Sequence, residues 1–186
     1  MFKRFGGAIY PRETRALVQR LVHTLEWEAR VLDLGGGTGI LSEIASEARP
    51  DLKCFVLDPA MGMLKNAPRF AGKVSGKAEN LPFADHTFGV VLIGDALHHF
   101  SDPQEALVQV RRVLGQKGRL FIFDIDPDTF MGRVITFAEK LFGEPALFFS
   151  PKRLSGLLKD EGFRPKINRH DWRYSVTAEA EEERRT

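Results

Sequence analysis

The sequence predicts one doubly wound α/β domain, in which a mostly parallel sheet carries helices on both faces. Three observations lead to this prediction. Segments with strand-like and helix-like spacing of apolar residues alternate along the chain. The run GVVLI at 89–93 is apolar throughout, as is typical of a strand covered on both faces. A glycine-rich loop at 35–39 follows an apolar strand and precedes a helix, the position where such sheets bind ligands.

Apolar spacing and helix-ending residues define the elements in the first half of the chain. After Pro11, leucine and valine recur at helical spacing over 12–25, which predicts an amphipathic helix. The elements expected after it are a strand at 31–34, a helix at 40–48, a strand at 53–57, a short helix at 60–67, a weak strand at 72–76 and the strand at 89–93.

The second half begins with a clear helix start. Asp102 offers a side-chain acceptor at the cap, Pro103 fits the first turn, and Gly115 ends the helix. The elements expected after it are a strand at 119–125, helices at 128–142 and 151–160, two strands within 164–178, and a solvated charged tail at 179–186.

Composition narrows the function. The 186 residues suit one domain and leave no room for a second catalytic domain. Lysine and arginine number 27 against 25 acidic residues, so we expect no nucleic-acid partner. The single cysteine, Cys54, excludes an internal disulfide and a cysteine-based zinc cluster, and we expect no metal. With no apolar run long enough for a membrane span and no signal peptide, we expect a cytoplasmic protein.

The glycine loop does not fit a phosphate ligand. The dinucleotide pattern G-x-G-x-x-G needs glycine where Ile40 stands, and no Lys-Ser/Thr pair follows the loop. Asp33 would repel a phosphate and suits a ligand with an ammonium group. The loop fits the pattern Asp-x-Gly-x-Gly-x-Gly, with Gly35, Gly37 and Gly39, although a tight turn without a ligand remains an alternative.

Four motifs occur in order: DLGGGTG at 33–39, LDPAMGML at 57–64, GKAENLPF at 76–83 and GDALHHF at 94–100. With these motifs the chain resembles the class I S-adenosylmethionine-dependent methyltransferases, and most of all the small-molecule branch that includes the ubiquinone/menaquinone-type enzymes. The resemblance covers about 28–125 strongly and 150–178 loosely. It implies a Rossmann-like, seven-stranded sheet, S-adenosylmethionine as cofactor, and a transferase.

The resemblance also implies a set of cofactor-binding residues. Asp33 would lie near the methionyl amine, and Asp58 would accept from both ribose hydroxyls, although Asp58 could also cap a helix. Met63 would either help to bind the cofactor or belong to the core. The other residues expected to contact the cofactor are Gly35, Gly36, Gly37, Gly39, Pro59, Ala78 and Gly94.

The adenine segment departs from the family pattern at one position. The residue before Ala78 is usually acidic or an amide that accepts from the adenine amino group, whereas this chain has Lys77, which only donates. Either Glu79 or a backbone carbonyl takes this role, or adenine is bound less tightly.

Methyl transfer needs alignment of the reactants, exclusion of water and removal of a proton from some acceptors. An imidazole can take that proton at neutral pH. His99 is the favoured candidate for contact with the acceptor, and His98 and Asp95 are the others. For each, a purely structural hydrogen bond is the alternative.

The segment before the helix at 151 is rich in phenylalanine. Its helix at 128–142 is apolar nearly all round, so it is either buried on two sides or it covers a hydrophobic pocket. We favour a lid, with Phe2, Phe5 and Tyr10 on its other side; ordinary core or a dimer patch is the alternative. We therefore divide the single domain 1–186 into an N-terminal helix and cap (1–28), a cofactor-binding core (29–125), a substrate-lid insertion (126–149), a C-terminal helix with the last strands (150–178) and a tail (179–186).

The sequence thus predicts methyl transfer from S-adenosylmethionine to a small, apolar or aromatic acceptor. The alternatives are a catalytically silent S-adenosylmethionine-binding protein and a methyltransferase acting on protein or nucleic acid. A nicotinamide oxidoreductase is disfavoured by Asp33 and Ile40. The sequence predicts neither the acceptor atom nor the oligomeric state.

Overall fold

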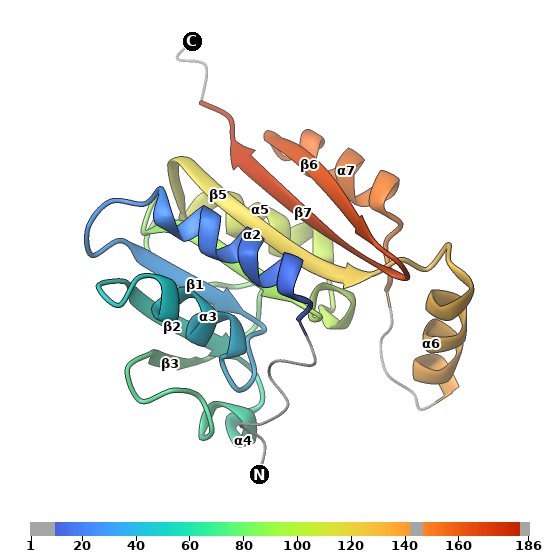
Figure 1. Ribbon diagram of the computed structural model, residues 1–186, viewed down its shortest axis with the longest axis horizontal. Helices are drawn as coiled ribbons and strands as arrows, with labels where there is room; N and C mark the ends of the chain where they lie inside the picture. Colours follow the sequence, from blue (N-terminus) through green and yellow to red (C-terminus); the bar gives the residue numbers. More distant parts are fainter. Residues whose placement is uncertain (1–9, 142–146, 183–186) are drawn as a thin grey trace.

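A seven-stranded sheet forms the centre of the protein, with strand order β3-β2-β1-β4-β5-β7-β6 (Figure 1). The computed structural model describes residues 10–141 and 147–182. The strands are β1 (Arg30–Leu34), β2 (Lys53–Asp58), β3 (Gly72–Ser75), β4 (Phe88–Gly94), β5 (Leu114–Ile125), β6 (Phe163–His170) and β7 (Arg173–Ala180). The first five strands pair in parallel, and β7 runs antiparallel to both β5 and β6. The predicted mostly parallel α/β fold is confirmed.

Helices cover both faces of the sheet (Figure 1). The helices of the described residues are α2 (Arg12–His23), α3 (Ile40–Ala48), α4 (Met61–Leu64), the 3₁₀ helix η2 (Leu97–His99), α5 (Pro103–Val113), α6 (Phe130–Leu141) and α7 (Pro151–Asp160), and all but α6 lie against the sheet or its ends. Residues of α2 and α3, such as Val22 and Ile44, share one buried cluster. Residues of α5 and α7, such as Val110 and Leu158, share the other. The sheet therefore has an apolar core on each face.

The predicted helix start at 102–103 is confirmed. Asp102 Oδ1 accepts hydrogen bonds from the backbone amides of Gln104 (3.1 Å) and Glu105 (3.0 Å), and Pro103 is the first helical residue. These bonds satisfy amides that have no partner inside the helix.

The structure corrects the predicted end of the last strand. The tail was expected to begin at residue 179, but β7 continues through Glu179 to Ala180, which pairs with Phe163. Ala178 and Ala180 are both buried, so buried alanines alternate with less buried residues along this segment. This alternation continues the strand into the charged segment that was expected to be a tail.

The structure also corrects one of the two interpretations of the apolar helix. Helix α6 stands apart from the two helical layers (Figure 1), and Phe130 and Phe137 are 82% and 71% exposed. It is therefore not buried on two sides. Tyr10, expected on the far side of a lid, instead packs in the core with its ring centroid 5.4 Å from that of Phe123. Phe2, Phe5 and Phe142 lie outside the described residues.

Candidate active site

The loops that follow β1, β2, β4 and β5 meet at one edge of the sheet, because the carboxyl ends of parallel strands lie side by side. The glycine loop follows β1, Asp58 ends β2, and the Asp95–His99 turn follows β4. Asp124 lies at the end of β5. The fold therefore brings the unusual residues of four motifs to one place.

The glycine loop lies closely against its neighbours. The backbone amides of Gly35 and Gly36 donate to the carbonyl oxygen of Leu57 (2.8 and 3.3 Å), which ties the loop to β2. Gly35 has φ of +65°, and a Cβ there would lie 2.7 Å from the Cβ of Ala96. Gly37 and Gly39 also have positive φ (+53° and +77°). A residue with a Cβ would be strained at these positive φ values. Glycine therefore allows the loop to pass close to the neighbouring segments.

Asp58 holds the far side of this loop. Its Oδ2 accepts from the Gly37 amide (2.9 Å) and its Oδ1 accepts from the Ala60 amide (2.7 Å). A carboxylate has about four lone-pair sites, so these two bonds leave both oxygens able to accept from ligand hydroxyls. The side chains beside it, Pro59 and Met63, are exposed, and Met63 lies over Gly37 rather than in the core.

Asp33 lies beneath the loop. Its Oδ2 accepts from the Ser42 amide in the first turn of α3 (2.9 Å), and the side chain is buried. A Cβ on Gly36 would lie 2.6 Å from the Asp33 carboxyl carbon. Burial raises the pKa of Asp33 to about 6, the Ser42 hydrogen bond opposes this, and the charge of Asp58 adds to it. In the structure Asp33 shapes the loop and caps α3.

This buried carboxyl predicts a pH-dependent stability. The pKa of Asp33 is about 6 in the folded protein and about 3.9 in an unfolded chain. As the pH falls from 7 to 5, the folded state therefore takes up a proton that the unfolded state does not. We expect the free energy of unfolding of the native protein, relative to that of Asp33→Asn, to rise by about 1 kcal/mol over this range. Urea denaturation of both proteins at pH 7 and pH 5 measures this, and parallel changes would contradict it.

In the structure, the predicted adenine segment still has a donor, Lys77, before Ala78, where the family pattern has an acceptor. Lys77 is exposed and Ala78 is buried. Glu79 Oε1 accepts from the Asp102 amide at the start of α5 (3.1 Å). One oxygen of Glu79 is therefore engaged in joining this segment to α5.

Gly94 ends β4 against Tyr10. A Cβ at Gly94 would overlap the Tyr10 hydroxyl and would lie 2.7 Å from Leu41 Cδ1. Burial, with the nearby charges of Asp33 and Asp95, raises the pKa of Tyr10 well above its usual range. Tyr10 is therefore a neutral hydroxyl at the end of β4, and its place in the site was not predicted.

The two histidines after β4 have different surroundings. His98 is buried, and its Nδ1 lies 2.7 Å from Asp124 Oδ1. Its Nε2 lies 3.8 Å from Glu139 Oε2 of α6, and the Phe148 ring stacks on it with centroids 4.2 Å apart. His99 is exposed, and its ring centroid lies 4.0 Å from that of His98.

Charge decides the protonation of His98. Burial lowers its pKa, but the hydrogen bond and charge of Asp124, with the charges of Asp95 and Glu139, outweigh burial and raise the pKa. Three buried carboxylate oxygens around it, one each on Asp95, Asp124 and Glu139, accept no hydrogen bond from the described residues. This part of the site therefore carries negative charge around one fixed imidazole.

Asp124 and Glu139 were missed from the sequence. Asp124 had a signal, since it is the one acidic residue in the apolar run RLFIFDI at 119–125. A buried acid near the carboxyl end of a strand is a candidate for function. Glu139 had none, because only the position of α6 brings it to His98.

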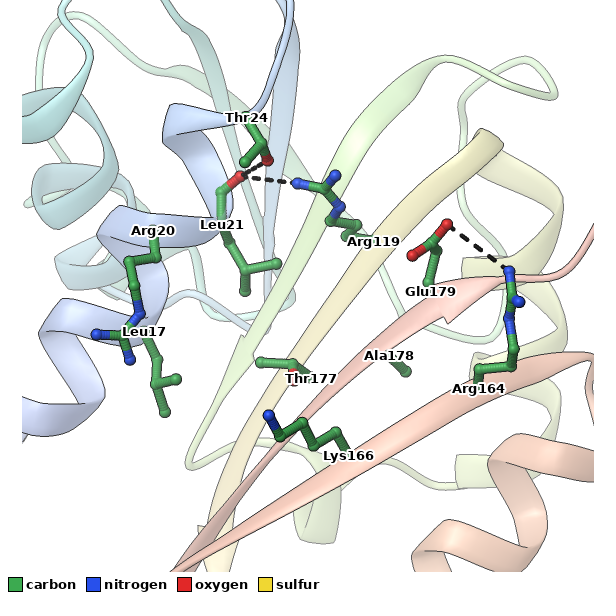
Figure 2. Close-up of a pocket in the computed structure, with 10 residues that line it drawn as sticks. All are labelled: Leu17, Arg20, Leu21, Thr24, Arg119, Arg164, Lys166, Thr177, Ala178 and Glu179. Carbon is green, nitrogen blue, oxygen red and sulfur yellow. Dashed lines mark hydrogen bonds and ion pairs between the residues drawn. The ribbon is translucent and has the colours of Figure 1, made fainter.

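A separate groove of about 390 Å³ lies between α2 and strands β5, β7 and β6 (Figure 2). It lies where Arg119 of β5 pairs with Glu179 near the end of β7; there Arg119 donates to the Leu21 carbonyl oxygen (3.4 Å), and Arg164 forms an ion pair with Glu179 (3.7 Å). The groove is far along the sheet from the glycine loop, so we assign it no part in the site.

Comparison with known proteins identifies the family. A methyltransferase-domain family matches residues 32–122. The chain is 30% identical to a demethylmenaquinone methyltransferase of Thermotoga maritima, over 72% of this chain and 69% of that protein. The chain belongs to the S-adenosylmethionine-dependent methyltransferases. The fold agrees: the YcgJ protein of Bacillus subtilis superimposes with a TM-score of 0.78 over 92% of this chain and 100% of that chain, at 19% identity.

The cofactor of this methyltransferase is S-adenosylmethionine. The geometry fits it: a narrow glycine loop gives room for a ligand, and Asp58 keeps acceptor capacity next to exposed Pro59 and Met63. In the described part of the chain, no helix is long and apolar enough to cross a membrane.

Proposed function

We propose that this methyltransferase acts on a small apolar or aromatic acceptor, bound at the carboxyl ends of β4 and β5 beside His99. The observation that carries this proposal is the pairing of an exposed imidazole, His99, with a buried one, His98, that Asp124 fixes.

We propose the following assignment for the cofactor. Asp58 accepts from the ribose hydroxyls, while the loop glycines and Gly94 leave space for the methionyl part. Ala78 borders the adenine ring, with Lys77 and Glu79 beside it. When bound, the cofactor supplies a methyl group on a positively charged sulfur, which an acceptor attacks in line with the breaking carbon–sulfur bond.

The protein's part in the chemistry is alignment and proton removal. His99 takes the acceptor proton at a ring nitrogen, and the His98 ring packs against the His99 ring. Asp124 fixes the orientation of His98, so it is a positioning residue. Asp95 lies in the same turn, and its charge helps to raise the pKa of His98.

The names of the relatives narrow the acceptor class. Besides the Thermotoga protein, several similar proteins are named demethylmenaquinone or ubiquinone/menaquinone methyltransferases. A reduced quinone ring is aromatic and carries phenolic hydroxyls, which an imidazole at neutral pH can deprotonate when the proton transfer is coupled to methylation. We therefore propose a quinol-like ring as the acceptor.

A product assay tests the proposal. The purified protein is incubated with S-adenosylmethionine and, separately, with quinols, simple phenols, amines, a mixed protein substrate and RNA, and methylated products are identified by mass. We expect transfer to quinols or phenols and none to protein or RNA. Cofactor binding without any transfer would instead indicate a silent binding protein, and transfer to macromolecules alone would overturn the proposal.

A further inference from the structure

Helix α6 has two opposite sides. Its inner side carries Gly132, which packs so closely on the Asp126 carbonyl that no Cβ would fit, and Glu139, which reaches His98. Half a turn around, the outer side carries four large apolar residues spaced by four, three and four positions, the repeat of a continuous stripe along a helix. They are Phe130, Val134, Phe137 and Leu141, with exposures of 82%, 48%, 71% and 73%.

The outer stripe is large for a surface that faces water. With Met131 on its flank (44% exposed), it presents roughly 500 Å² of apolar side chain, at the upper end of the largest patch on a typical monomer. Figure 1 shows α6 away from the helical layers, and the stripe residues are exposed among the residues that the structure describes. Such a patch indicates an interaction surface.

The charged side chains of α6 favour a partner that is apolar inside and polar at its surface. Among the described side chains of α6, the only acid is Glu139, and it faces inward to His98. Among the described side chains of the outer half, the one charge is the exposed cation of Arg133 at the edge of the stripe. An apolar stripe with a cation at its edge and no outward acid is typical of helices that lie in a membrane interface.

A second copy of the chain fits less well. Two such stripes laid together would bury roughly 1,000 Å² in total, below the about 1,200–2,000 Å² of stable protein interfaces. A bilayer has no such threshold, since each inserted apolar side chain contributes separately.

We propose that the outer side of α6 binds the surface of a lipid bilayer, so that an acceptor dissolved in the bilayer enters the site from the membrane. The inference rests on the proposed function for its acceptor, an apolar ring compound. It adds that the acceptor reaches the active site from the bilayer. Because the stripe is apolar, binding needs no anionic lipid, in agreement with the near-neutral charge of the chain.

Vesicle sedimentation of the full chain tests this surface. We expect the native protein to pellet with neutral phosphatidylcholine vesicles, and the double variant Phe130→Ser/Phe137→Ser to lose at least about 10-fold in partition coefficient, since each phenylalanine contributes more than 1 kcal/mol of transfer free energy. The matched control is Trp27→Ser/Phe70→Ser, which removes two exposed apolar side chains elsewhere (79% and 53% exposed). Equal melting temperatures verify that all three proteins are folded.

Activity separates this inference from the proposed function. On a water-soluble quinol, the native protein and the α6 double variant should turn over equally. On a long-chain quinol in vesicles, the variant should lose the same factor as in sedimentation. If the native protein did not bind vesicles, the proposed membrane-binding role of α6 would be wrong. Activity on the soluble quinol would still support the proposed function. A native dimer in light scattering that the double variant converts to monomer would show that a second copy covers the stripe.

Discussion

We expect Asp58→Ala to lose measurable cofactor binding at concentrations that saturate the native enzyme. The substitution deletes the proposed acceptor of the ribose hydroxyls and leaves the amides of Gly37 and Ala60 without their carboxylate. Two lost hydrogen bonds to a charged group, at about 1.5–3 kcal/mol each, correspond to at least about a 100-fold rise in Kd. Calorimetric titration with S-adenosylhomocysteine, the cofactor product, measures it.

Two further variants make this result specific. Asp58→Asn keeps one acceptor oxygen and should give an intermediate affinity. Asp85→Ala removes an exposed carboxylate that pairs with Arg112 (2.8 Å) and should bind as the native protein does. If Asp58→Ala and Asp85→Ala bound the ligand equally, Asp58 would have no part in cofactor binding.

We expect His99→Ala to lower kcat by about 100-fold or more, the usual contribution of a general base, and to leave cofactor affinity within about twofold. The reason is that His99 is exposed beside the proposed acceptor position, while Asp58 and the glycine loop, proposed to hold the cofactor, follow β2 and β1. Steady-state rates on a soluble quinol, together with the calorimetric Kd, measure both effects.

The matched control is His23→Ala, which removes another exposed imidazole at the end of α2. Its kcat should be unchanged. Unchanged kcat in His99→Ala as well would exclude His99 as an essential base and would direct attention to Asp95 and His98.

Much of the fold follows from the chain's local patterns. The strand at 89–93 is apolar throughout and lies at the centre of the sheet as β4. Strands on both sides and helices on both faces bury its side chains, so apolar residues suit every position. The glycine loop was predicted because its residues are consecutive. Its positive φ angles then follow from the sharp turn between β1 and α3.

The parts that the sequence did not predict depend on contacts between distant segments. Asp124 supports His98 only because β5 lies next to β4, with Phe123 paired to Gly94. Tyr10 fills the space at Gly94 because α2 crosses the same face. For α6, apolar residues on nearly every side left its exposed side undefined, since the pattern contains no polar face to mark the solvent.

The edges of the sheet bear on how the protein behaves at high concentration. A sheet edge offers unpaired backbone groups to which another chain can add a strand, which leads to aggregation. One edge strand here, β3, has only four residues. The other, β6, contains Pro165, which lacks a donor, between exposed Arg164 and Lys166. Both edges therefore disfavour strand addition, so self-association of this protein should proceed through side chains rather than through an extended sheet.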